Sequence, residues 1–443
     1  MKADIQEIVR NQRDFFNSGQ TKKLITRKRN LRLLKKTVAG NQKILCDGVF
    51  VDLKRDQKAT FIMEINNALV EIDYMLDNLD KWAAPQSVEK TFLTALDSPV
   101  IWKDPKGVVL LIAPWNYPIC MILLPMINIL AAGNTIVIKP SELAPNAAEA
   151  VDLVFSKFFD RNIVAVVKGG IAETAELLKE RFDHIIYTGS PSVGKIVMGA
   201  AAKHLTPVTL ELGGKSPVVV EDDADIETSA RRVAWGKWMN CGQTCLAPDY
   251  VLISASKKKR FADALRSAVE EFYGNAVKNS EDYGRIINAR HFDRLNDLLC
   301  SSRSPILFQA GEPDRKDLFF PPLVLDASPS DPFMLDEIFG PVLPIITSQN
   351  LSESIDFVNQ REKPLAAYIF TRSESKVERF CGETSSGAVT VNDVIMHLAV
   401  DTLPFGGVGN SGIGRYRGKF GFDTFTHEKA VLKRRFFGEA LLA

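Results

Sequence analysis

The sequence predicts an α/β protein with two doubly wound domains, each a mainly parallel sheet with helices on both faces, and a small β arm. Three observations lead to this prediction. Short β-branched or apolar runs alternate with helical patterns from residue 107 to about residue 210. The same alternation starts again after Gly213. The chain of 443 residues is also longer than one hydrophobic core usually supports.

The residues before this alternation are expected to form amphipathic helices. Residues 21–39 and 61–79 repeat apolar side chains at helical spacing. The first of these segments is strongly basic, and we interpret its charges as a solvated helix face rather than a nucleic-acid-binding surface.

The first alternating region contains a long uncharged run. Its expected strands and helices are strands 108–113, 135–138, 163–167, 184–188 and 208–212, and helices 118–132, 144–159, 172–181 and 191–203. Residues 107–138 carry no charged side chain, which exceeds the roughly 20 residues of a membrane helix. Pro114, Pro118 and Pro125 interrupt this run and favour a buried strand, turn, helix and second strand.

The second alternating region predicts another α/β domain. Its expected strands and helices lie at 216–220, 224–240, 249–255, 258–273, 288–299, 342–347, 365–371 and 388–391. The arm is expected to pair the proline-flanked strand 98–106 with the tail, residues 420–432, in which Phe422, Phe425 and Val431 have strand-like spacing. No regular helix is expected after the glycine-dense loop 404–414.

Composition excludes several classes of protein. With 55 basic and 54 acidic residues, the chain has no global field for nucleic acid or an anionic membrane. Six scattered cysteines without a C-x-x-C pair, and five histidines without ligand spacing, give no sign of a metal site. They indicate a reducing compartment, so we expect a location in the cytoplasm or on the cytosolic face of a membrane.

Cys245 is the candidate centre of the chemistry. It follows Gly242-Gln-Thr and precedes a proline three residues later. Thiol chemistry requires a thiolate, and we expect backbone N–H groups at a helix start to lower the pKa of Cys245. The alternative for an isolated cysteine is a buried structural residue.

Glu211 is the second candidate, 34 residues upstream. It lies between two leucines and is followed by Gly213 and Gly214. A carboxylate at an apolar strand end must be paired, be neutral or have a use, because burying an unpaired charge is costly. Glu211 is therefore a candidate general base or, alternatively, a partner of Lys215.

These two segments together resemble a known family. Glu211-Leu-Gly-Gly-Lys-Ser-Pro followed by Gly242-Gln-Thr-Cys245 is similar to the active-site pair of the aldehyde dehydrogenase superfamily. The longer stretch from Asn240 to Tyr250 resembles the class 3 branch, the fatty and aromatic aldehyde dehydrogenases. The resemblance implies that Cys245 is the nucleophile, Glu211 the general base, and Asn116, in a Trp-Asn-Tyr-Pro turn, an oxyanion donor.

The resemblance also implies a nicotinamide cofactor, NAD and possibly NADP. In the family, Lys139 and Glu142 correspond to residues that hold the adenosine ribose, Gly189 to Gly194 to the pyrophosphate turn, and Glu337 and Phe339 to contacts of the nicotinamide riboside. The full set implied for the cofactor is Trp115, Lys139, Glu142, Gly189, Ser190, Gly194, Leu212, Glu337 and Phe339.

The expected reaction is NAD(P)-dependent oxidation of apolar aldehydes to carboxylic acids. Medium- or long-chain aliphatic and aromatic substrates are expected because apolar residues flank the motifs, among them Tyr117, Trp235, Met239 and Phe405, with Met396 and Leu398. Plain core packing is the alternative explanation of that cluster. The route implied is a Cys245 thiohemiacetal, then a thioester that Glu211 helps to hydrolyse. A dehydrogenase that instead passes the thioester to coenzyme A would usually lack this glutamate.

The resemblance implies an organisation for the whole chain. Residues 1–97 and 107–210 would form the NAD(P)-binding domain, 211–415 the catalytic domain, and 98–106 with 416–443 a bridging arm through which a homodimer forms. Some relatives end in an apolar anchor. The last residues here, 436–443, are too few to span a bilayer, so membrane association would require an anchor that is absent or truncated.

Two other classes of function are open at this point. Cys245 and Glu211 could serve a cofactor-independent cysteine hydrolase, which failure to bind NAD or NADP would favour. A scaffolding protein that has kept the fold without the chemistry is the other, and the combination of Cys245, Glu211 and Asn116 argues against it.

Overall fold

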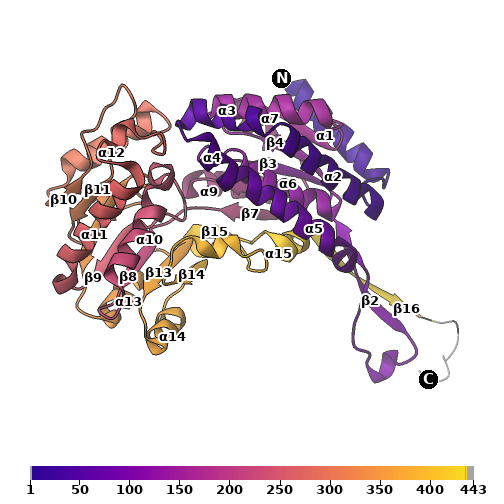
Figure 1. Cartoon of the computed structure of the whole chain (residues 1–443). Coiled ribbons are helices and arrows are strands. Elements are labelled where there is room, and N and C mark those ends of the chain that lie inside the picture. The colour runs from indigo at the N-terminus through magenta and orange to yellow at the C-terminus, as the bar shows by residue number, and fades with distance from the viewer. Residues whose placement is uncertain (1, 435, 437–443) are drawn as a thin grey trace.

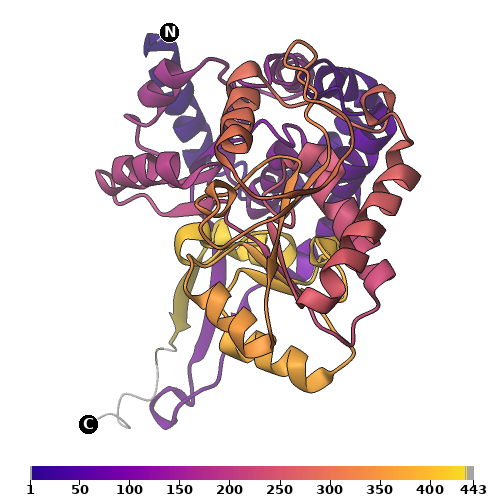
Figure 2. The ribbon, with the colours of Figure 1, turned by 90° about the vertical axis from the view of Figure 1, so that its left-hand side faces the viewer.

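The computed structural model describes residues 2–434 and residue 436, and it consists of two α/β lobes and a projecting arm (Figure 1). The N-terminal helices and the first alternating region form one lobe, and the second alternating region forms the other (Figures 1 and 2). The predicted fold class is confirmed. We expected residues 436–443 to be too few to span a bilayer. Most of them lie outside the residues that the structure describes.

The first lobe contains a six-stranded sheet in the order β15-β7-β6-β3-β4-β5. Its strands are β3 (Val108–Ile112), β4 (Thr135–Lys139), β5 (Val164–Val166), β6 (His184–Thr188), β7 (Val208–Glu211) and β15 (Gly412–Ile413). Neighbouring strands are parallel, except that β15 pairs antiparallel with β7. Because β3 lies between β4 and β6, the strand order reverses there, and a crevice is expected at the carboxyl ends of these strands.

Helices cover both faces of this sheet because successive strand residues point to opposite sides. Val109 and Leu111 of β3 belong to one buried cluster and Val108 and Leu110 to another. The helices that follow the strands are α6 (Cys120–Ala132), α7 (Pro145–Phe158), α8 (Ile171–Leu177) and α9 (Pro191–Ala202). Every residue of α6 is buried, so the uncharged run forms the predicted strand, turn, helix and strand.

The N-terminal helices pack around the first lobe (Figure 1). They are α1 (Lys2–Asn17), α2 (Leu24–Gly40), α3 (Gln42–Leu53), α4 (Gln57–Thr60), the π-helix η1 (Phe61–Asn66) and α5 (Asn67–Ala83). Helix α3 packs on α7, and α5 packs on α2 and α6. The two segments that the sequence predicts to be amphipathic helices correspond to α2 and to η1 with α5.

The second lobe contains a seven-stranded sheet in the order β10-β11-β12-β9-β8-β13-β14, parallel except for the β10–β11 pair. Its strands are β8 (Pro217–Val220), β9 (Tyr250–Ile253), β10 (Ile306–Gln309), β11 (Leu323–Asp326), β12 (Val342–Thr347), β13 (Ala366–Phe370) and β14 (Ala388–Val391). Its helices are α10 (Ile226–Trp238), α11 (Ala255–Tyr273), α12 (Ala289–Ser301), α13 (Leu351–Asn359) and α14 (Glu374–Glu383). Sequence patterns did not predict β10, β11, α13 or α14.

The arm is a three-stranded sheet of β1 (Gln86–Ser87), β2 (Ser98–Pro105) and β16 (Thr426–Lys433). Strands β2 and β16 pair antiparallel along their whole length, as the sequence predicts. The arm projects away from both lobes in two views (Figures 1 and 2).

Two details of the C-terminal region differ from the prediction. Residues Gly418–Thr424 form a helix, α15, where no helix was expected. The Phe422 ring packs 6.0 Å from Trp82 and the Phe425 ring 5.1 Å from His184, so both anchor the arm to the lobe instead of belonging to a strand. Their apolar spacing is satisfied by burial against the N-terminal helices and the sheet. In addition, β15 carries residues 412–413 back to the first sheet.

Within residues 2–434, no helix combines the length and the apolar character that crossing a bilayer requires.

Candidate active site

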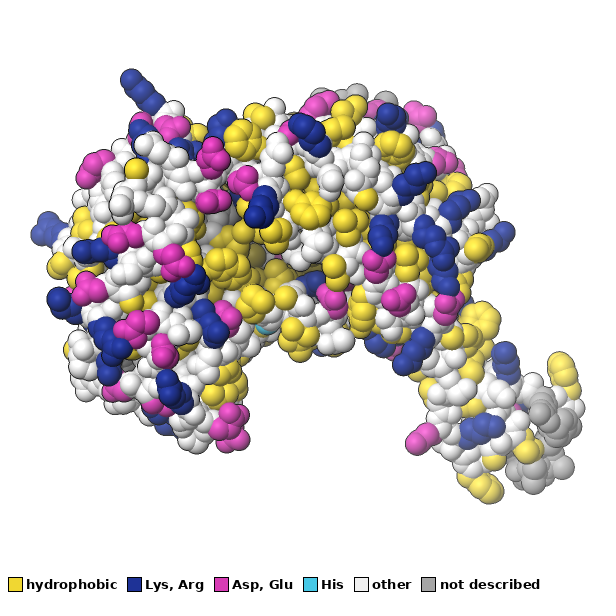
Figure 3. All heavy atoms as spheres, in the orientation of Figure 1, with side chains coloured by type: hydrophobic (Ala, Val, Ile, Leu, Met, Phe, Trp, Pro, Cys, Tyr) yellow, Lys and Arg dark blue, Asp and Glu magenta, His cyan; other side chains and the backbone are white. Residues whose placement is uncertain are grey.

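A cleft of about 1940 Å³ lies between the two lobes. The carboxyl ends of β3, β4, β6 and β7 form one wall, and the segments around residues 235–246 and 332–339 form the other. Hydrophobic side chains gather where the surface is hollowed between the lobes (Figure 3). Of the residues predicted for the site, all except Gly194 line this cleft.

Cys245 is presented by an unusual turn. Helix α10 ends at Trp238, and Asn240, Cys241 and Gly242 then adopt left-handed φ angles of 52°, 55° and 72° in succession. Such angles strain residues other than glycine. A Cβ at Gly242 would lie 2.2 Å from the carbonyl oxygen of Gly340, so only glycine allows this turn to pack against the backbone at Gly340.

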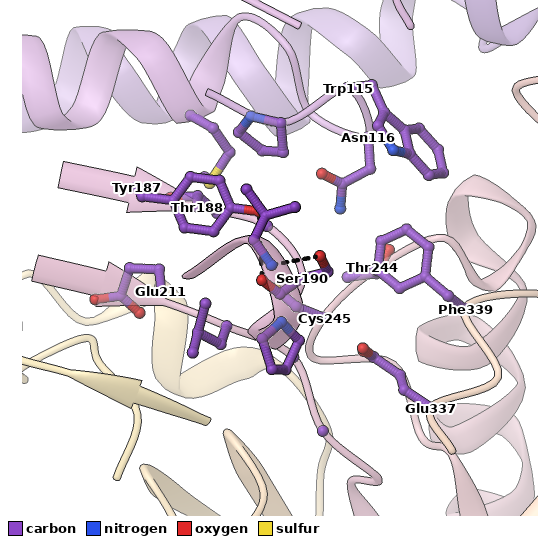
Figure 4. A pocket seen from close by; sticks show the side chains of 18 of the residues that line it. Trp115, Asn116, Tyr187, Thr188, Ser190, Glu211, Thr244, Cys245, Glu337 and Phe339 are labelled. Atoms are coloured by element: carbon purple, nitrogen blue, oxygen red, sulfur yellow. Dashed lines mark hydrogen bonds between the residues drawn. The ribbon is translucent and has the colours of Figure 1, made fainter. Parts of the chain in front are cut away.

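Asn116 lies beside the Cys245 loop. Its turn connects β3 to α6, and its Nδ2 donates a hydrogen bond of 3.0 Å to the carbonyl oxygen of Gln243, two residues before Cys245. Asn240 donates from its own Nδ2 to the same carbonyl and to the carbonyl oxygen of Asn116. Figure 4 shows the Asn116 amide on the side of the cleft opposite Glu337.

The thiol of Cys245 is protonated at neutral pH in this arrangement. Burial, followed by the Glu337 and Glu211 carboxyls, raises the pKa of Cys245 to about 12. Backbone N–H groups at Cys245 and Leu246 favour the thiolate but are outweighed. The expectation that a helix start lowers this pKa is wrong, because residues 243–249 form turns and loop and no helix begins there.

Glu211 ends β7 and is 2% exposed. Neither of its carboxyl oxygens has a hydrogen-bond partner within the described part of the chain. Burial raises the pKa of Glu211 well above its ordinary value and so favours the neutral form of this carboxyl. The alternative that it pairs with Lys215 is wrong. Lys215 binds Asp249 and two backbone carbonyl groups instead.

Glu337 reaches the cleft from the second lobe. Its carboxyl group lies against the backbone of Gly213 and accepts a hydrogen bond from the N–H of Gly214. A Cβ at Gly213 would lie 2.0 Å from Glu337 Oε2, so the glycine permits this close approach. Burial and the nearby Asp249 raise the pKa of Glu337 to about 8, although Lys215 and other groups oppose the shift.

An aromatic group stands next to Glu337. The rings of Phe339 and Trp115 are 5.3 Å apart, and Trp115 lies 5.1 Å from the ring of His291. Both His291 nitrogens are buried without a hydrogen-bond partner among the described residues. Burial and the neighbouring Arg294 and Arg290 lower the pKa of His291 to about 4. The sequence analysis missed His291, since no motif marks it.

The other end of the cleft has the features of an anion site. Gly189 and Ser190 stand at the N-terminus of α9, where Ser190 caps the helix by accepting from the N–H of Val193. Backbone N–H groups and the helix dipole favour a phosphate there. Gly194 lies one turn into α9, where a Cβ would meet Leu212 at 3.0 Å, so its hydrogen allows helix and strand end to pack.

Lys139 is buried at the end of β4. Its Nζ donates to the carbonyl oxygen of Pro140 at 2.8 Å and lies 3.5 Å from a carboxyl oxygen of the exposed Glu142. Burial lowers the pKa of Lys139, and Glu142 partly offsets that shift. A buried cation beside an exposed carboxylate forms a polar edge on a mostly apolar cleft.

Residues 1–431 match the model of the aldehyde dehydrogenase family. The chain belongs to this family. It is 46% identical over 433 residues to mouse "Aldehyde dehydrogenase, dimeric NADP-preferring", covering 98% of this chain and 95% of the relative. It is 47% identical over 430 residues to mouse "Aldehyde dehydrogenase family 3 member A2", covering 97% and 88%.

Solved structures agree with this assignment. A substrate-bound Staphylococcus aureus AldH superimposes with a TM-score of 0.95 at 42% identity, covering 97% of this chain and 94% of that one. A Mycobacterium tuberculosis aldehyde dehydrogenase complexed with NAD+ gives 0.89 at 25% identity, covering 99% and 91%. The protein is therefore an NAD(P)-dependent enzyme that oxidises aldehydes.

The cleft of this aldehyde dehydrogenase suits a dinucleotide. It offers the N-terminus of α9 to phosphates, an aromatic slot at Trp115 and Phe339, and the unpartnered nitrogens of His291. Within residues 2–434, no group of three or more His, Cys, Asp or Glu is arranged to hold a metal ion.

Much of the lining of the cleft is apolar. Tyr117, Trp235, Met239 and Phe405 line it, as do Met396 and Leu398. The sequence analysis missed other members of this wall, namely Ile62, Met63, Met121 and Ile395. Ile62 and Met63 come from the π-helix η1, and only the folded chain brings that segment to the dehydrogenase cleft.

Proposed function

We propose that this aldehyde dehydrogenase oxidises apolar aldehydes through a thiohemiacetal and then a thioester on Cys245, and that Glu211 is the general base for hydrolysis of the thioester. The observation that carries the proposal is the meeting of Cys245, Asn116 and Glu211 in one cleft whose lining is largely apolar. The three side chains come from parts of the chain up to 129 positions apart in sequence.

The first step requires the sulfur to attack the carbonyl carbon and a donor to meet the oxygen that becomes negative. Asn116 Nδ2 has a second N–H besides the one donated to Gln243, and the backbone N–H of Cys245 lies on the reacting residue itself. Two such donors, held in place before the reaction, are what this step needs; loss of one typically slows catalysis about 100- to 1000-fold.

When bound, the oxidised dinucleotide supplies a positively charged ring that accepts hydride. The residues of this chain that would hold it are the N-terminus of α9 and Lys139 at one end and Glu337 and Phe339 at the other. Glu337 is held against Gly213 and Gly214, so its position is fixed by the backbone of the same loop that follows Glu211.

Release of the acid needs a water molecule that loses a proton. Glu211 has two free carboxyl oxygens in an apolar surrounding. Its raised pKa makes the ionised form a stronger base than an ordinary glutamate. These properties favour proton transfer from water over a structural ion pair.

Variants at the two residues test the mechanism. Cys245→Ala should abolish both NAD-dependent aldehyde oxidation and hydrolysis of p-nitrophenyl acetate. Glu211→Gln should retain a single burst of NADH but slow steady-state turnover about 100-fold or more, because acylation remains and deacylation lacks its base. An alanine variant that still turned over would exclude Cys245 as nucleophile. Failure to bind NAD or NADP, with ester hydrolysis by Cys245 retained, would support the hydrolase alternative.

The apolar lining of the cleft supports a preference for medium- or long-chain and aromatic aldehydes. Apolar side chains from both lobes line the cleft beside Cys245, among them Tyr117 and Trp235. We expect kcat/KM to rise about tenfold for every two methylenes buried, since each contributes roughly 0.8 kcal/mol. A short acidic semialdehyde that outcompeted octanal or benzaldehyde in kcat/KM would contradict the preference.

The proposal for the nucleotide is that both NAD and NADP are accepted. Exposed Glu142 disfavours a 2′-phosphate by repulsion, while Lys139 offsets part of this charge at 3.5 Å. Two of the rodent relatives carry the name NADP-preferring. Measuring KM for each nucleotide with one aldehyde tests this, and a difference above about 1000-fold would contradict it.

We also propose a homodimer formed through the arm. The same relatives are named dimeric, and the arm carries exposed apolar side chains, among them Phe92, Leu93 and Leu432. Exposed apolar surface of this kind on a projecting sheet is typical of an interface between subunits.

A further inference from the structure

A buried ion pair lies directly behind the turn that carries Asn116. Arg55 follows α3, and Glu64 is part of the π-helix η1. They are 3% and 0% exposed, and their side chains form an ion pair. Single π-helical turns are rare and occur frequently at functional sites.

Arg55 contacts the turn itself. Its Nη1 donates a hydrogen bond of 3.1 Å to the carbonyl oxygen of Asn116, and its guanidinium lies 4.8 Å from the centre of the Tyr117 ring. Its Nε donates to Thr60 Oγ1 at 3.3 Å. The planar guanidinium thus holds two successive residues of the turn from behind.

Glu64 contacts the other end of the turn. Its Oε2 accepts hydrogen bonds from the N–H groups of Ile119 and Cys120, at 2.7 and 2.9 Å. These are the first N–H groups of α6, where a carboxylate is favourable because the helix N-terminus carries partial positive charge. The ion pair therefore fixes the turn at Asn116 and again at the start of the helix.

Such an arrangement is costly unless it has a use. Burying two charges often stabilises a protein less than apolar residues of the same shape would, so a buried pair is weak evidence for stability. A rate, by contrast, is sensitive to small displacements: an error of about 1 Å in a reacting group can cost about 100-fold. Apart from the bond from Arg55 to Thr60, the hydrogen bonds of Arg55 and Glu64 all join the segment 116–120, which carries Asn116 and Tyr117.

We propose that Arg55 and Glu64 are positioning residues, which hold the Asn116 amide toward the oxygen of the substrate and the Tyr117 ring in the apolar wall. This inference rests on the oxyanion role proposed for Asn116. It assigns a function to the N-terminal helices, which lie outside both sheets: they set the geometry of the reacting site from behind.

The test compares Arg55→Gln, Arg55→Lys and Glu64→Gln with the wild type, all below their unfolding temperatures. Arg55→Gln and Glu64→Gln should lower kcat for aldehyde oxidation about 10- to 100-fold, and p-nitrophenyl acetate hydrolysis in parallel, with KM for NAD changed less than twofold. Arg55→Lys keeps a charge that can reach Glu64 and should restore most of the rate. The matched control is Arg13→Gln, which removes another N-terminal arginine that pairs with a carboxylate, Asp183, and should alter stability only.

A double-mutant cycle distinguishes positioning from a general loss of structure. If Arg55 acts through Asn116, the variant Arg55→Gln with Asn116→Ala should be no slower than Asn116→Ala alone. Multiplying effects, or rates that stay at the wild-type level in both Arg55→Gln and Glu64→Gln, would overturn the inference. If Asn116→Ala itself retained full activity, the proposed oxyanion role would fail first. Should Arg55→Gln not fold, the same cycle is made with Glu64→Gln.

Discussion

Two carboxyl groups, Glu211 and Glu337, approach the Cys245 sulfur from different walls of the cleft, and burial raises the pKa of both. Each also raises the pKa of Cys245. At the scale of single residues, burial therefore favours the neutral forms of the thiol and of both carboxyls. Removing one carboxyl should make the sulfur easier to ionise.

Glu337→Gln tests this coupling. The Glu337 carboxylate is ionised above about pH 8 and then repels a thiolate, so its loss should lower the pKa of Cys245. The rate of p-nitrophenyl acetate hydrolysis rises with pH as the thiolate forms. This rise should move to lower pH in the variant, measured without nucleotide. Glu149→Gln, a surface control on α7, should leave the profile in place. If the rise stayed at the same pH in Glu337→Gln, this carboxyl would not control the pKa of Cys245.

Glu211→Gln should also change stability with pH. The pKa of Glu211 is raised in the folded protein above 4.5, so the folded state binds this proton more tightly than the unfolded chain. Stability from this group is present below about pH 4.5 and is lost as the pH rises toward the folded pKa. The melting temperature of Glu211→Gln should exceed that of the wild type more at pH 8 than at pH 5. A constant difference would contradict the assignment of a buried, unpaired carboxyl.

At the scale of elements, the turn after α10 decides where Cys245 stands. Asn240, Cys241 and Gly242 all have left-handed φ angles. The carbonyl oxygen of Gly340 packs directly against Gly242. Backbone strain at such positions persists only when surrounding contacts enforce it. The turn and the 332–340 segment must therefore move together.

Gly242→Ala should disturb this pair of segments. A Cβ there would lie 2.2 Å from the backbone oxygen at a φ of 72°, so we expect a loss of about 2–4 kcal/mol in stability and a fall in kcat of at least tenfold. Denaturant unfolding and steady-state rates measure both. Gly40→Ala, which meets nothing within 4 Å at the end of α2, is the matched control and should be neutral within about 0.5 kcal/mol. A stable, fully active Gly242→Ala would mean that this contact is not what places Cys245.

At the scale of the whole molecule, the arm is connected to the first lobe by buried residues on one side and is exposed on the other. Lys103 of β2 forms ion pairs with Asp423 of α15 and Glu428 of β16. The ring of Phe425 packs near that of His184. The arm is therefore held in a defined direction rather than free to swing. This favours a fixed interface between two copies.

Phe92→Asp with Leu93→Asp should weaken the proposed dimer. These side chains are 95% and 69% exposed in the arm, and charges there would have to be desolvated in an interface. We expect a dissociation constant at least 100-fold larger, measured by sedimentation equilibrium. Leu205→Asp, 91% exposed on the first lobe, is the control and should leave the mass unchanged. A double variant that stayed as dimeric as the wild type would place the interface elsewhere.

The sequence by itself determined the alternation of strands and helices, the strand character of residues 98–106 and the family, because each is written in local patterns. Strand ends and glycine motifs such as those at Glu211 and Gly242 are also local, so almost every predicted site residue lines the cleft. Spacing could not predict that Phe422 and Phe425 anchor the arm instead of forming a strand, since apolar residues are buried wherever a partner surface exists.

Only the tertiary structure decided the pKa values and ion pairs of the site and the contacts behind the Asn116 turn. The pKa of Cys245 depends on burial and on carboxyls distant in sequence, so the local expectation of a lowered value was wrong. Lys215 pairs with Asp249 and not with Glu211, although Glu211 is closer in sequence. Arg55 meets Asn116 across 61 residues, a contact that no motif records. Energies that depend on which distant groups exclude water are fixed by packing of the whole chain, and packing is not a local property of sequence.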